Sequence, residues 1–472
     1  MTPPRQPLVV LYLVDGARPD VMEELLASGD LPHIRREIVA SGTSRTATSC
    51  FPSTTGPAYL PFLMGCFPGT INIPGIRWLD KSEFHAKSWG KNRFRSYNGI
   101  EAPWFNDDLP LERPTIYERF ERPFNIFSML TRGLPPGHNL TGASKPFWYL
   151  YAHLTDRWHP VDGASHHHLM RALEGAPDFV FAVFPGVDSY SHLRHPRHEE
   201  TLAAYRTVDR SVGRLAARLK RLGRWDDTLV IITSDHGLTA TGRHLDLAAF
   251  LEERGLKTLS YPIIWKANPQ ASVMISGNAM GQVYCLNGSG RAALVGDEVG
   301  AALGSRLEEL LAREEIDFAA WRHGEGAYEI AAARGRAVIR STPAGLTYQP
   351  TSGDPFGLGT LSTPLDRRLA LEATFHSEYP DALVQIEQLF ACGRTGDLVV
   401  ASRNGCDLRE AYEWPEHHSS HGSLHREHMM VPLLYNRTGW DPRPARTTDL
   451  FNTILKWSGK PTVEGTDGEP LC

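Results

Sequence analysis

The chain has 472 residues, and its 49 lysines and arginines stand against 54 aspartates and glutamates, a formal net charge of −5 at pH 7. This balance excludes a generally basic nucleic-acid-binding protein, and we expect no nucleic acid as a binding partner. A hydrophobic fraction of 41% and this length predict an ordinary globular protein, either several domains or one large α/β domain with insertions.

The first predicted element is a buried strand over Leu8–Val14, which ends at Asp15. This run is shorter than the ~18 apolar residues of a membrane helix, and no other run approaches that length, so we expect no transmembrane segment. The proline-rich start, Met1 to Pro7, does not resemble a signal peptide. The six cysteines are spread out without a Cys-x-x-Cys pair, which predicts free thiols and a cytoplasmic location.

Two further buried strands are predicted over Phe179–Phe184 and Leu229–Thr233, and a fourth over Leu398–Ser402. Between the second and third, residues 199–222 carry apolar side chains at every third or fourth position, which predicts an amphipathic helix. Strands alternating with helices indicate an α/β fold with a doubly wound, mostly parallel sheet flanked by helices. Such sheets bind ligands at the carboxyl ends of their strands.

Two stretches interrupt this alternation. Residues 71–175 are rich in Trp, Arg, Asn and Pro and show little periodicity, so we predict an irregular insertion there. We interpret its triplet His166-His167-His168 as part of a surface loop. Residues 262–365 contain short strand-like runs between Gly and Pro turns, which predicts a small inserted β-rich cap. The predicted α/β core is then residues 1–261 and 366–472.

Six residues of metal-ligating type stand at strand ends or in glycine-flanked turns: Asp15, Asp188, His192, Asp235, His236 and His421. Asp188 and His192 are four residues apart, so one helical turn would place both on one face. Carboxylates and imidazoles together suit Zn²⁺, and Mn²⁺ or iron accepts the same ligands. Six candidates are too many for one tetrahedral zinc, so we predict two Zn²⁺ ions.

A turn rich in hydroxyl groups, Pro52-Ser53-Thr54-Thr55-Gly56-Pro57, precedes a helical stretch over Ala58–Met64. A hydroxyl at the start of a helix commonly caps it. Beside a bound metal and backbone N–H groups it also serves as a nucleophile toward an anion.

The order of these motifs is Asp-Gly, the Thr turn, Asp-x-x-x-His, Ser-Asp-His-Gly and a late His-Gly. It resembles the alkaline phosphatase superfamily, and most of all its type I phosphodiesterase / nucleotide pyrophosphatase branch. The resemblance covers residues 8–70, 178–246 and about 395–472. It implies that one zinc is held by Asp15, Asp235 and His236, and the other by Asp188, His192 and His421. The same resemblance implies Thr55 as the nucleophile and metal ligand, with Thr54 as the alternative register.

The family further implies a hydrolase that cleaves a small-molecule phosphodiester or pyrophosphate through a covalent phospho-threonine. Weaker candidates for substrate contacts are Asn72, Arg77 and Trp78, which follow the Thr turn. A sulfatase is excluded, because Cys50-Phe51-Pro52-Ser53-Thr54 has Thr where the sulfatase motif has Arg. A phosphomonoesterase or phosphomutase, a phosphonate hydrolase and a non-catalytic relative remain as alternatives.

Overall fold

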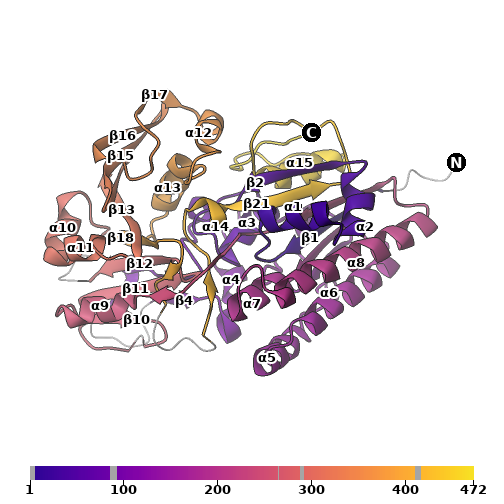
Figure 1. Ribbon diagram of the computed structural model, residues 1–472, viewed down its shortest axis with the longest axis horizontal. Coiled ribbons are helices and arrows are strands. Elements are labelled where there is room, and N and C mark those ends of the chain that lie inside the picture. Colours follow the sequence, from indigo (N-terminus) through magenta and orange to yellow (C-terminus); the bar gives the residue numbers. More distant parts are fainter. Residues whose placement is uncertain (1–5, 86–92, 264, 287–291, 410–415) are drawn as a thin grey trace.

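The computed structural model describes residues 6–85, 93–263, 265–286, 292–409 and 416–472. Two sheets dominate the fold and lie in opposite halves of the molecule, the first beside the long helices and the second toward the other end (Figure 1).

The first sheet has seven strands in the order β22-β2-β21-β7-β1-β6-β5. Its strands are β1 (Leu8–Val14), β2 (Thr43–Thr48), β5 (Pro123–Ile126), β6 (Phe179–Phe184), β7 (Thr228–Thr233), β21 (Met430–Tyr435) and β22 (Ala445–Arg446). Strand β1 runs parallel to both β6 and β7, and β5 runs parallel to β6, whereas β21 is antiparallel to β2 and β7. Every residue of β1 is buried, as expected for a central parallel strand. The predicted α/β fold with a mostly parallel sheet is confirmed.

Helices flank this sheet, and the predicted amphipathic helix is α8. Its apolar stripe packs against α7 and α6, and its acidic first turn and basic last turn complement the helix dipole. The helices of this half are α1 (Pro19–Ser28), α2 (Pro32–Ile34), α3 (Leu60–Met64), α4 (Trp104–Asp107), α5 (Lys145–Thr155), α6 (His159–Ala172), α7 (Gly186–Leu193), α8 (Glu199–Arg221), α14 (Arg426–Met429) and α15 (Asp449–Trp457).

The second sheet has nine strands in the order β10-β11-β12-β18-β13-β14-β15-β16-β17. They are β10 (Thr258–Ser260), β11 (Ala271–Ser276), β12 (Met280–Cys285), β13 (Ile316–Gly324), β14 (Ala327–Ala332), β15 (Gly335–Thr342), β16 (Gly345–Gly353), β17 (Leu361–Leu365) and β18 (Leu398–Ser402). Its helices are α9 (Leu247–Glu253), α10 (Asp297–Leu303), α11 (Ser305–Leu311), α12 (Arg367–Thr374) and α13 (Ala382–Ala391). Short ribbons complete the fold: β3 (Arg77–Leu79) with β4 (Phe94–Ser96), β8 (Thr239–Ala240) with β20 (Ser419–Ser420), and β9 (Arg243–His244) with β19 (Cys406–Asp407).

The fourth predicted strand, Leu398–Ser402, differs from expectation in its partners. We expected it in the α/β core, but as β18 it lies in the second sheet, antiparallel to β12 and β13. All five of its residues are buried. A short apolar run that is buried on both faces has the same sequence pattern in either sheet, so the pattern does not identify the neighbouring strands.

The interpretation of residues 71–175 as irregular is wrong for their second half. Strand β5 forms the edge of the first sheet, and α6 packs against β6 and α8. The triplet His166-His167-His168 lies within α6 rather than in a loop, with His166 Nδ1 at 2.9 Å from Ser211 Oγ. Glycine, proline and histidines occupy so many positions of α6 that its apolar periodicity is weak.

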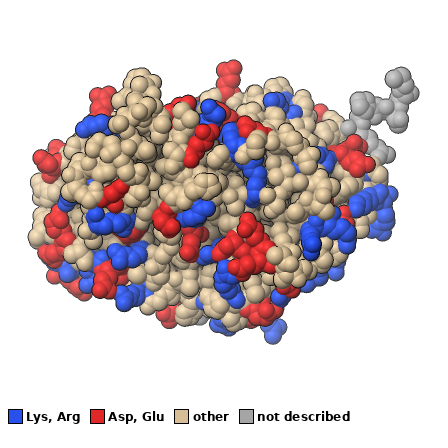
Figure 2. All heavy atoms as spheres, turned by 45° about the horizontal axis from the view of Figure 1, so that its top comes forward, with Lys and Arg blue, Asp and Glu red and all other residues tan. Residues whose placement is uncertain are grey.

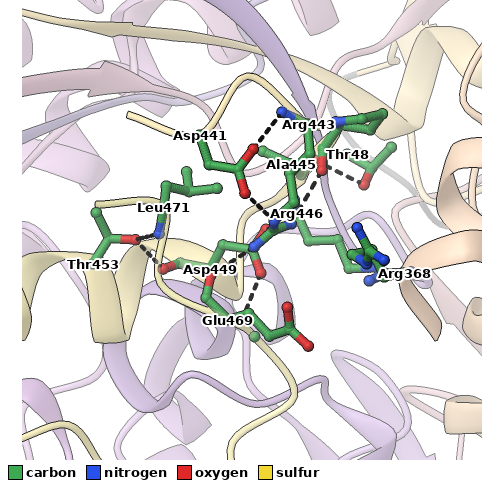
Figure 3. Close-up of polar contacts among 12 residues, drawn as sticks. Thr48, Arg368, Asp441, Arg443, Ala445, Arg446, Asp449, Thr453, Glu469 and Leu471 are labelled. Atoms are coloured by element: carbon green, nitrogen blue, oxygen red, sulfur yellow. Dashed lines mark hydrogen bonds and ion pairs between the residues drawn. The ribbon is translucent and has the colours of Figure 1, made fainter. Parts of the chain in front are cut away.

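The C-terminal segment is tied to the first sheet through Asp449 (Figure 3). This buried carboxylate accepts hydrogen bonds from the backbone N–H groups of Arg446 and Glu469 and from the Arg443 guanidinium, at 2.9–3.0 Å. The backbone N–H of Leu471 donates to Thr453 Oγ1 at 2.8 Å. A buried carboxylate with three donors holds the residues after α15 against the body of the protein.

The distribution of charged side chains on the surface agrees with the near-balanced charge of the chain. Acidic and basic side chains are interspersed on the face shown in Figure 2. Within the described ranges, no helix is both long enough and apolar enough to cross a bilayer. All six cysteines are free thiols, as predicted.

A buried ion pair joins the segment after β3 to the residue before β18. Lys81 Nζ lies 2.7 and 2.9 Å from the carboxylate oxygens of Asp397, which also accept the N–H groups of Cys285 and Leu294. Substitution Lys81→Met leaves this carboxylate buried without its counter-ion, and we expect a loss of about 3–5 kcal/mol in unfolding free energy by urea denaturation.

Two comparisons test the cause of that loss. The double variant K81M/D397N should recover part of it, since no uncompensated charge is left. Substitution Arg243→Met, which breaks an exposed pair with Glu314, should cost at most about 1 kcal/mol. Equal losses in K81M and R243M would contradict the argument.

Candidate active site

The six predicted metal-ligating residues meet at one edge of the first sheet. Asp15 follows β1, Asp188 and His192 lie on α7 directly after β6, and Asp235 and His236 follow β7. Because β6, β1 and β7 are adjacent and parallel, their carboxyl ends lie side by side.

The sixth residue, His421, comes from the far end of the chain. It follows β20, which pairs with β8 just beyond His236. The rings of His421 and His236 stack with centroids 3.7 Å apart. The two-stranded ribbon therefore brings a histidine from the C-terminal part to the ends of the central strands.

Two overlapping groups of possible ligand atoms result, each with all its atoms within 4.8 Å of one another. They are Asp188 with His192 and His421, and Asp15 with Asp188 and His236. Asp235 adjoins the second group, since its Oδ2 lies 3.4 Å from His236 Nε2. The family resemblance gave Asp188 to one metal alone, whereas the structure places it within reach of both groups.

Each imidazole presents the same nitrogen to the cluster. The Nδ1 atoms of His192, His236 and His421 lie 2.7, 3.1 and 2.9 Å from the backbone oxygens of Ser419, Gly237 and Ser53. With Nδ1–H donating to a carbonyl, Nε2 keeps its lone pair for a metal. Burial, reinforced by His236, lowers the pKa of His421 well below its ordinary value, which favours the neutral, ligating form.

The carboxylates crowd one another. Burial, then the charges of Asp235 and Asp188, raise the pKa of Asp15 well above its ordinary value. Burial also raises the pKa of Asp235, whose Oδ2 accepts no hydrogen bond from any residue that the structure describes. For Asp188 burial acts in the same direction, but His192 outweighs it and the pKa is lowered. Three converging carboxylates with inward-facing imidazoles fit divalent metal ions, whose charge offsets their repulsion.

The hydroxyl-rich turn places Thr55 rather than Thr54 at this cluster. Thr55 Oγ1 lies 3.0 Å from His236 Nε2 and 3.3 Å from Asp15 Oδ1, whereas Thr54 is buried. Gly56 has a φ of +92°, and a Cβ there would meet Met129 Sδ at 2.9 Å. Glycine therefore permits the close turn that exposes Thr55.

Several neighbours of the cluster were not predicted. Tyr59 donates a hydrogen bond to Asp15 Oδ2 at 3.3 Å, and it lies one helical turn after Thr55, a spacing that would have identified it. The ring of His417 lies 4.2 Å from that of His192. The carboxylates of the site also influence two groups on α5. Burial, and then the charge of Asp15, raises the pKa of Tyr149. Burial lowers the pKa of Lys145 to about 8, although the charge of Asp15 acts in the opposite direction.

The three weaker candidates for substrate contacts have other partners. Trp78 is fully buried and donates from Nε1 to Tyr97. Asn72 Oδ1 accepts from the Cys392 thiol at 3.0 Å, and the Arg77 guanidinium lies over the ring of Tyr261. Burial of Trp78 leaves it no surface for a substrate.

A cleft of about 700 Å³ is lined by residues from the segments that carry the cluster, but by none of the six candidate ligands and not by Thr55. Five of its lining residues lie two or three positions from a candidate ligand: Arg18, Arg194, His195, Thr239 and His418.

A buried carboxyl outside the cluster, that of Asp162, contacts the start of α7. Asp162 Oδ1 accepts the N–H of Gly186 at 3.0 Å, at the start of the helix that carries Asp188. Burial raises the pKa of Asp162 from 3.8 to about 7, so folding favours its protonated form. Stability is therefore lost as the pH rises from about 4 to about 7, on the order of 4 kcal/mol in all.

We therefore expect Asp162→Asn to be more stable than the unmodified protein at pH 8, and we expect the difference to shrink steadily toward pH 4. A carboxyl with a raised native pKa contributes stability below its unfolded pKa and loses it as the pH rises toward 7. Thermal unfolding of both proteins between pH 4 and pH 8 measures the difference in their stability. A difference that does not change with pH would show that the pKa of Asp162 is not raised.

Comparison with known proteins identifies the family in which this arrangement occurs. The family model of "Type I phosphodiesterase / nucleotide pyrophosphatase" matches residues 9–424. Bis(5'-adenosyl)-triphosphatase enpp4 of Mus musculus is 22% identical over 272 residues, which are 57% of this chain and 55% of that protein. The catalytic subunit of GPI ethanolamine phosphate transferase 3 of Mus musculus is 34% identical over 87 residues, 18% of this chain and 8% of that protein. The chain thus spans about half or less of the length of these curated relatives.

Two kinds of solved structure share the fold across nearly the whole chain. Murine ectonucleotide pyrophosphatase / phosphodiesterase 5 has a TM-score of 0.58 at 14% identity and covers 97% of this chain and 96% of its own. Phosphonoacetate hydrolase from Sinorhizobium meliloti 1021, in complex with phosphonoacetate, has a TM-score of 0.56 at 18% identity, with 96% of each chain covered. Because the family model spans residues 9–424, this chain belongs to the type I phosphodiesterase / nucleotide pyrophosphatase family of hydrolases.

Proposed function

We propose that this protein is a two-zinc phosphodiesterase that hydrolyses a small phosphodiester or pyrophosphate through a covalent intermediate on Thr55. The observation that carries the proposal is the position of Thr55 Oγ1, 3.0 Å from His236 Nε2 and 3.3 Å from Asp15 Oδ1 at the edge of the ligand cluster. The metal-ligating residues would be Asp15, Asp188, His192, Asp235, His236 and His421, with Thr55 as a further ligand.

Divalent ions bound by these residues would supply Lewis acidity, neutralising phosphoryl charge and easing deprotonation of a hydroxyl group or water. The residues of the chain account for the remaining steps. Thr55 Oγ1 forms a bond to phosphorus as the bond to the leaving oxygen breaks, and its proton is directed toward the Asp15 carboxylate. Water then replaces Thr55 at phosphorus, so two in-line displacements give net retention of configuration.

A second candidate function, hydrolysis of a phosphomonoester or a phosphonate, is favoured by Lys145. This ammonium donates to the backbone oxygen of Phe127 at 2.6 Å and lies 5.1 Å from the centroid of the Tyr149 ring. It is a cation beside the acidic cluster, and a phosphoryl group with an additional negative charge gains most from such a cation. The fold shared with phosphonoacetate hydrolase is consistent with this candidate.

We expect Lys145→Met to reduce kcat/KM for p-nitrophenyl phosphate and phosphonoacetate about tenfold or more, and that for bis(p-nitrophenyl) phosphate by less than about threefold. The reason is that the diester carries one negative charge and the other two carry more. Steady-state kinetics of the zinc-loaded protein give the three ratios. Equal losses on all three substrates would show that Lys145 does not discriminate by charge.

The proposed function is tested by turnover of bis(p-nitrophenyl) phosphate, p-nitrophenyl phosphate and phosphonoacetate by zinc-loaded protein, with a chelator control. Faster turnover of the diester, abolished by the chelator and restored by Zn²⁺, supports the phosphodiesterase. A clear preference for the monoester or the phosphonate moves the assignment to the second candidate. Turnover of the diester that survives the chelator would overturn the metal-dependent mechanism.

A further inference from the structure

Exposed apolar side chains are concentrated in one part of the chain. Among the described residues, nine large hydrophobic side chains are exposed, and five of them fall within residues 104–154: Trp104, Leu111, Phe147, Leu150 and Leu154. Exposure reaches 61–68% for the three on α5. Scattered single apolar residues are normal on a surface, so the concentration matters only where the side chains lie together in space.

The three side chains on α5 form one line. Phe147, Leu150 and Leu154 are spaced by three and four residues, so they lie along one face of the helix. We call these three residues the apolar stripe. The helix from Lys145 to Thr155 contains no Asp or Glu, and its half-buried Trp148 and Tyr151 add amphipathic rings. In Figure 1, α5 lies at the edge of the molecule, beyond the end of α6.

The elements that carry these exposed residues also border the site. Lys145, at the start of α5, donates to the backbone oxygen of Phe127, and Asn106 of α4 donates to that of Met129 at 2.9 Å. Met129 in turn lies against Gly56, next to Thr55. Helices α4 and α5 therefore both rest on the loop that touches the turn of the candidate nucleophile.

We propose that the apolar stripe docks on the surface of a lipid bilayer and brings phosphoester groups displayed at that surface to the cluster. The proposal rests on the proposed function for its substrate class, the phosphoesters of lipids. Helices with Trp, Phe and Leu on one face lie in the interfacial zone of a membrane, where amphipathic rings are also favoured. The absence of carboxylates on α5 removes repulsion from headgroup phosphates.

The area of the stripe disfavours the rival occupant, a second copy of this chain. Three partly exposed large side chains offer roughly 400 Å², about half of what each partner contributes to a standard-size protein interface. A bilayer needs no complementary surface, and its apolar interior accepts side chains of any shape. The stripe therefore fits an interfacial contact better than a stable dimer.

The test is co-sedimentation with phosphatidylcholine vesicles over a series of lipid concentrations. We compare the full-length protein with the variant F147S/L150S/L154S and with a matched control, L222S/V295S/L369S, which removes three other exposed apolar side chains. We expect the unmodified protein and the control to bind vesicles, and the stripe variant to lose at least tenfold in partition coefficient. Turnover of soluble bis(p-nitrophenyl) phosphate should be unchanged in both variants, which shows that they are folded.

Three outcomes would overturn the proposal. The first is no vesicle binding by the unmodified protein at any lipid concentration, and the second is equal binding by the stripe variant. The third is a dimer in size-exclusion chromatography that the stripe variant abolishes, because a second copy would then cover the stripe. Vesicle binding does not depend on catalysis, so loss of the proposed activity and loss of docking are distinguishable.

Discussion

Replacement of Thr55 by alanine is expected to lower kcat for bis(p-nitrophenyl) phosphate by about 10³-fold or more, because it removes the atom that would attack phosphorus. Thr55 Oγ1 already lies 3.0 Å from His236 Nε2, so no rearrangement of the turn is required. Retention of zinc by the variant, measured by metal analysis, would separate lost chemistry from lost metal.

The neighbouring hydroxyl provides the matched control. Thr54→Ala should keep kcat within about threefold, since Thr54 is buried and Thr55 supplies the hydroxyl at the cluster, and should affect mainly stability. Thr55→Ser keeps a hydroxyl and should recover part of the activity. Full activity in T55A together with an inactive T54A would show that the register of the nucleophile is shifted by one residue.

Replacement of Asp235 by asparagine is expected to act in opposite directions on activity and on the stability of the metal-free protein. Activity should fall by about 10²-fold or more, because a ligand charge is lost from the cluster. Without metal the variant should melt at a higher temperature than the unmodified protein, since one of three crowded carboxylates no longer ionises.

The sign of the pH dependence follows from the raised pKa values of Asp15 and Asp235. Groups with raised native carboxyl pKa values favour the folded state when protonated, so the stability gain of D235N should grow as the pH rises. Thermal unfolding at pH 6 and pH 8, with chelator or with Zn²⁺, gives four comparisons. Asp107→Asn, an exposed site, is the control for loss of one carboxylate.

A D235N variant with a lower melting temperature in chelator at both pH values would contradict this explanation. It would mean that the negative charge of Asp235 itself stabilises the metal-free fold, since asparagine retains the oxygen that accepts from the backbone N–H of Gly16. If Zn²⁺ raised the melting temperature of D235N as much as that of the unmodified protein, Asp235 would not be a metal ligand.

The main sheet was predictable because its central strands are continuous apolar runs. Leu8–Val14 and Phe179–Phe184 are strands with the predicted limits, and the polar residues at their ends mark the edge where the cluster forms. Parallel pairing then requires that Asp15, Asp188 and Asp235 approach one another. These parts of the site follow from local pattern and the geometry of parallel sheets.

Other parts depend on contacts that no local pattern encodes. Leu398–Ser402 is an apolar run like the others, and only its tertiary partners place it in the second sheet. Lys145 stands in a helix with no motif, and its proximity to the cluster arises from the packing of α5 on the loop of Phe127. His417 lacks the His-Gly context that distinguished His421, so the sequence did not separate it from the other histidines of residues 414–428, and only the fold brings its ring 4.2 Å from that of His192.

The position of β21 has a consequence for biosynthesis. This strand lies between β2 and β7, although roughly 200 residues separate the end of β7 from its start, so at 5–20 residues per second ribosomes need about 10–40 s to supply it. During that interval β2 has no partner on either side and β7 lacks one, and these unpaired edges invite pairing with other nascent chains. Rapid capture by a chaperone, or slow initiation that spaces neighbouring ribosomes, would improve the recombinant yield of this protein.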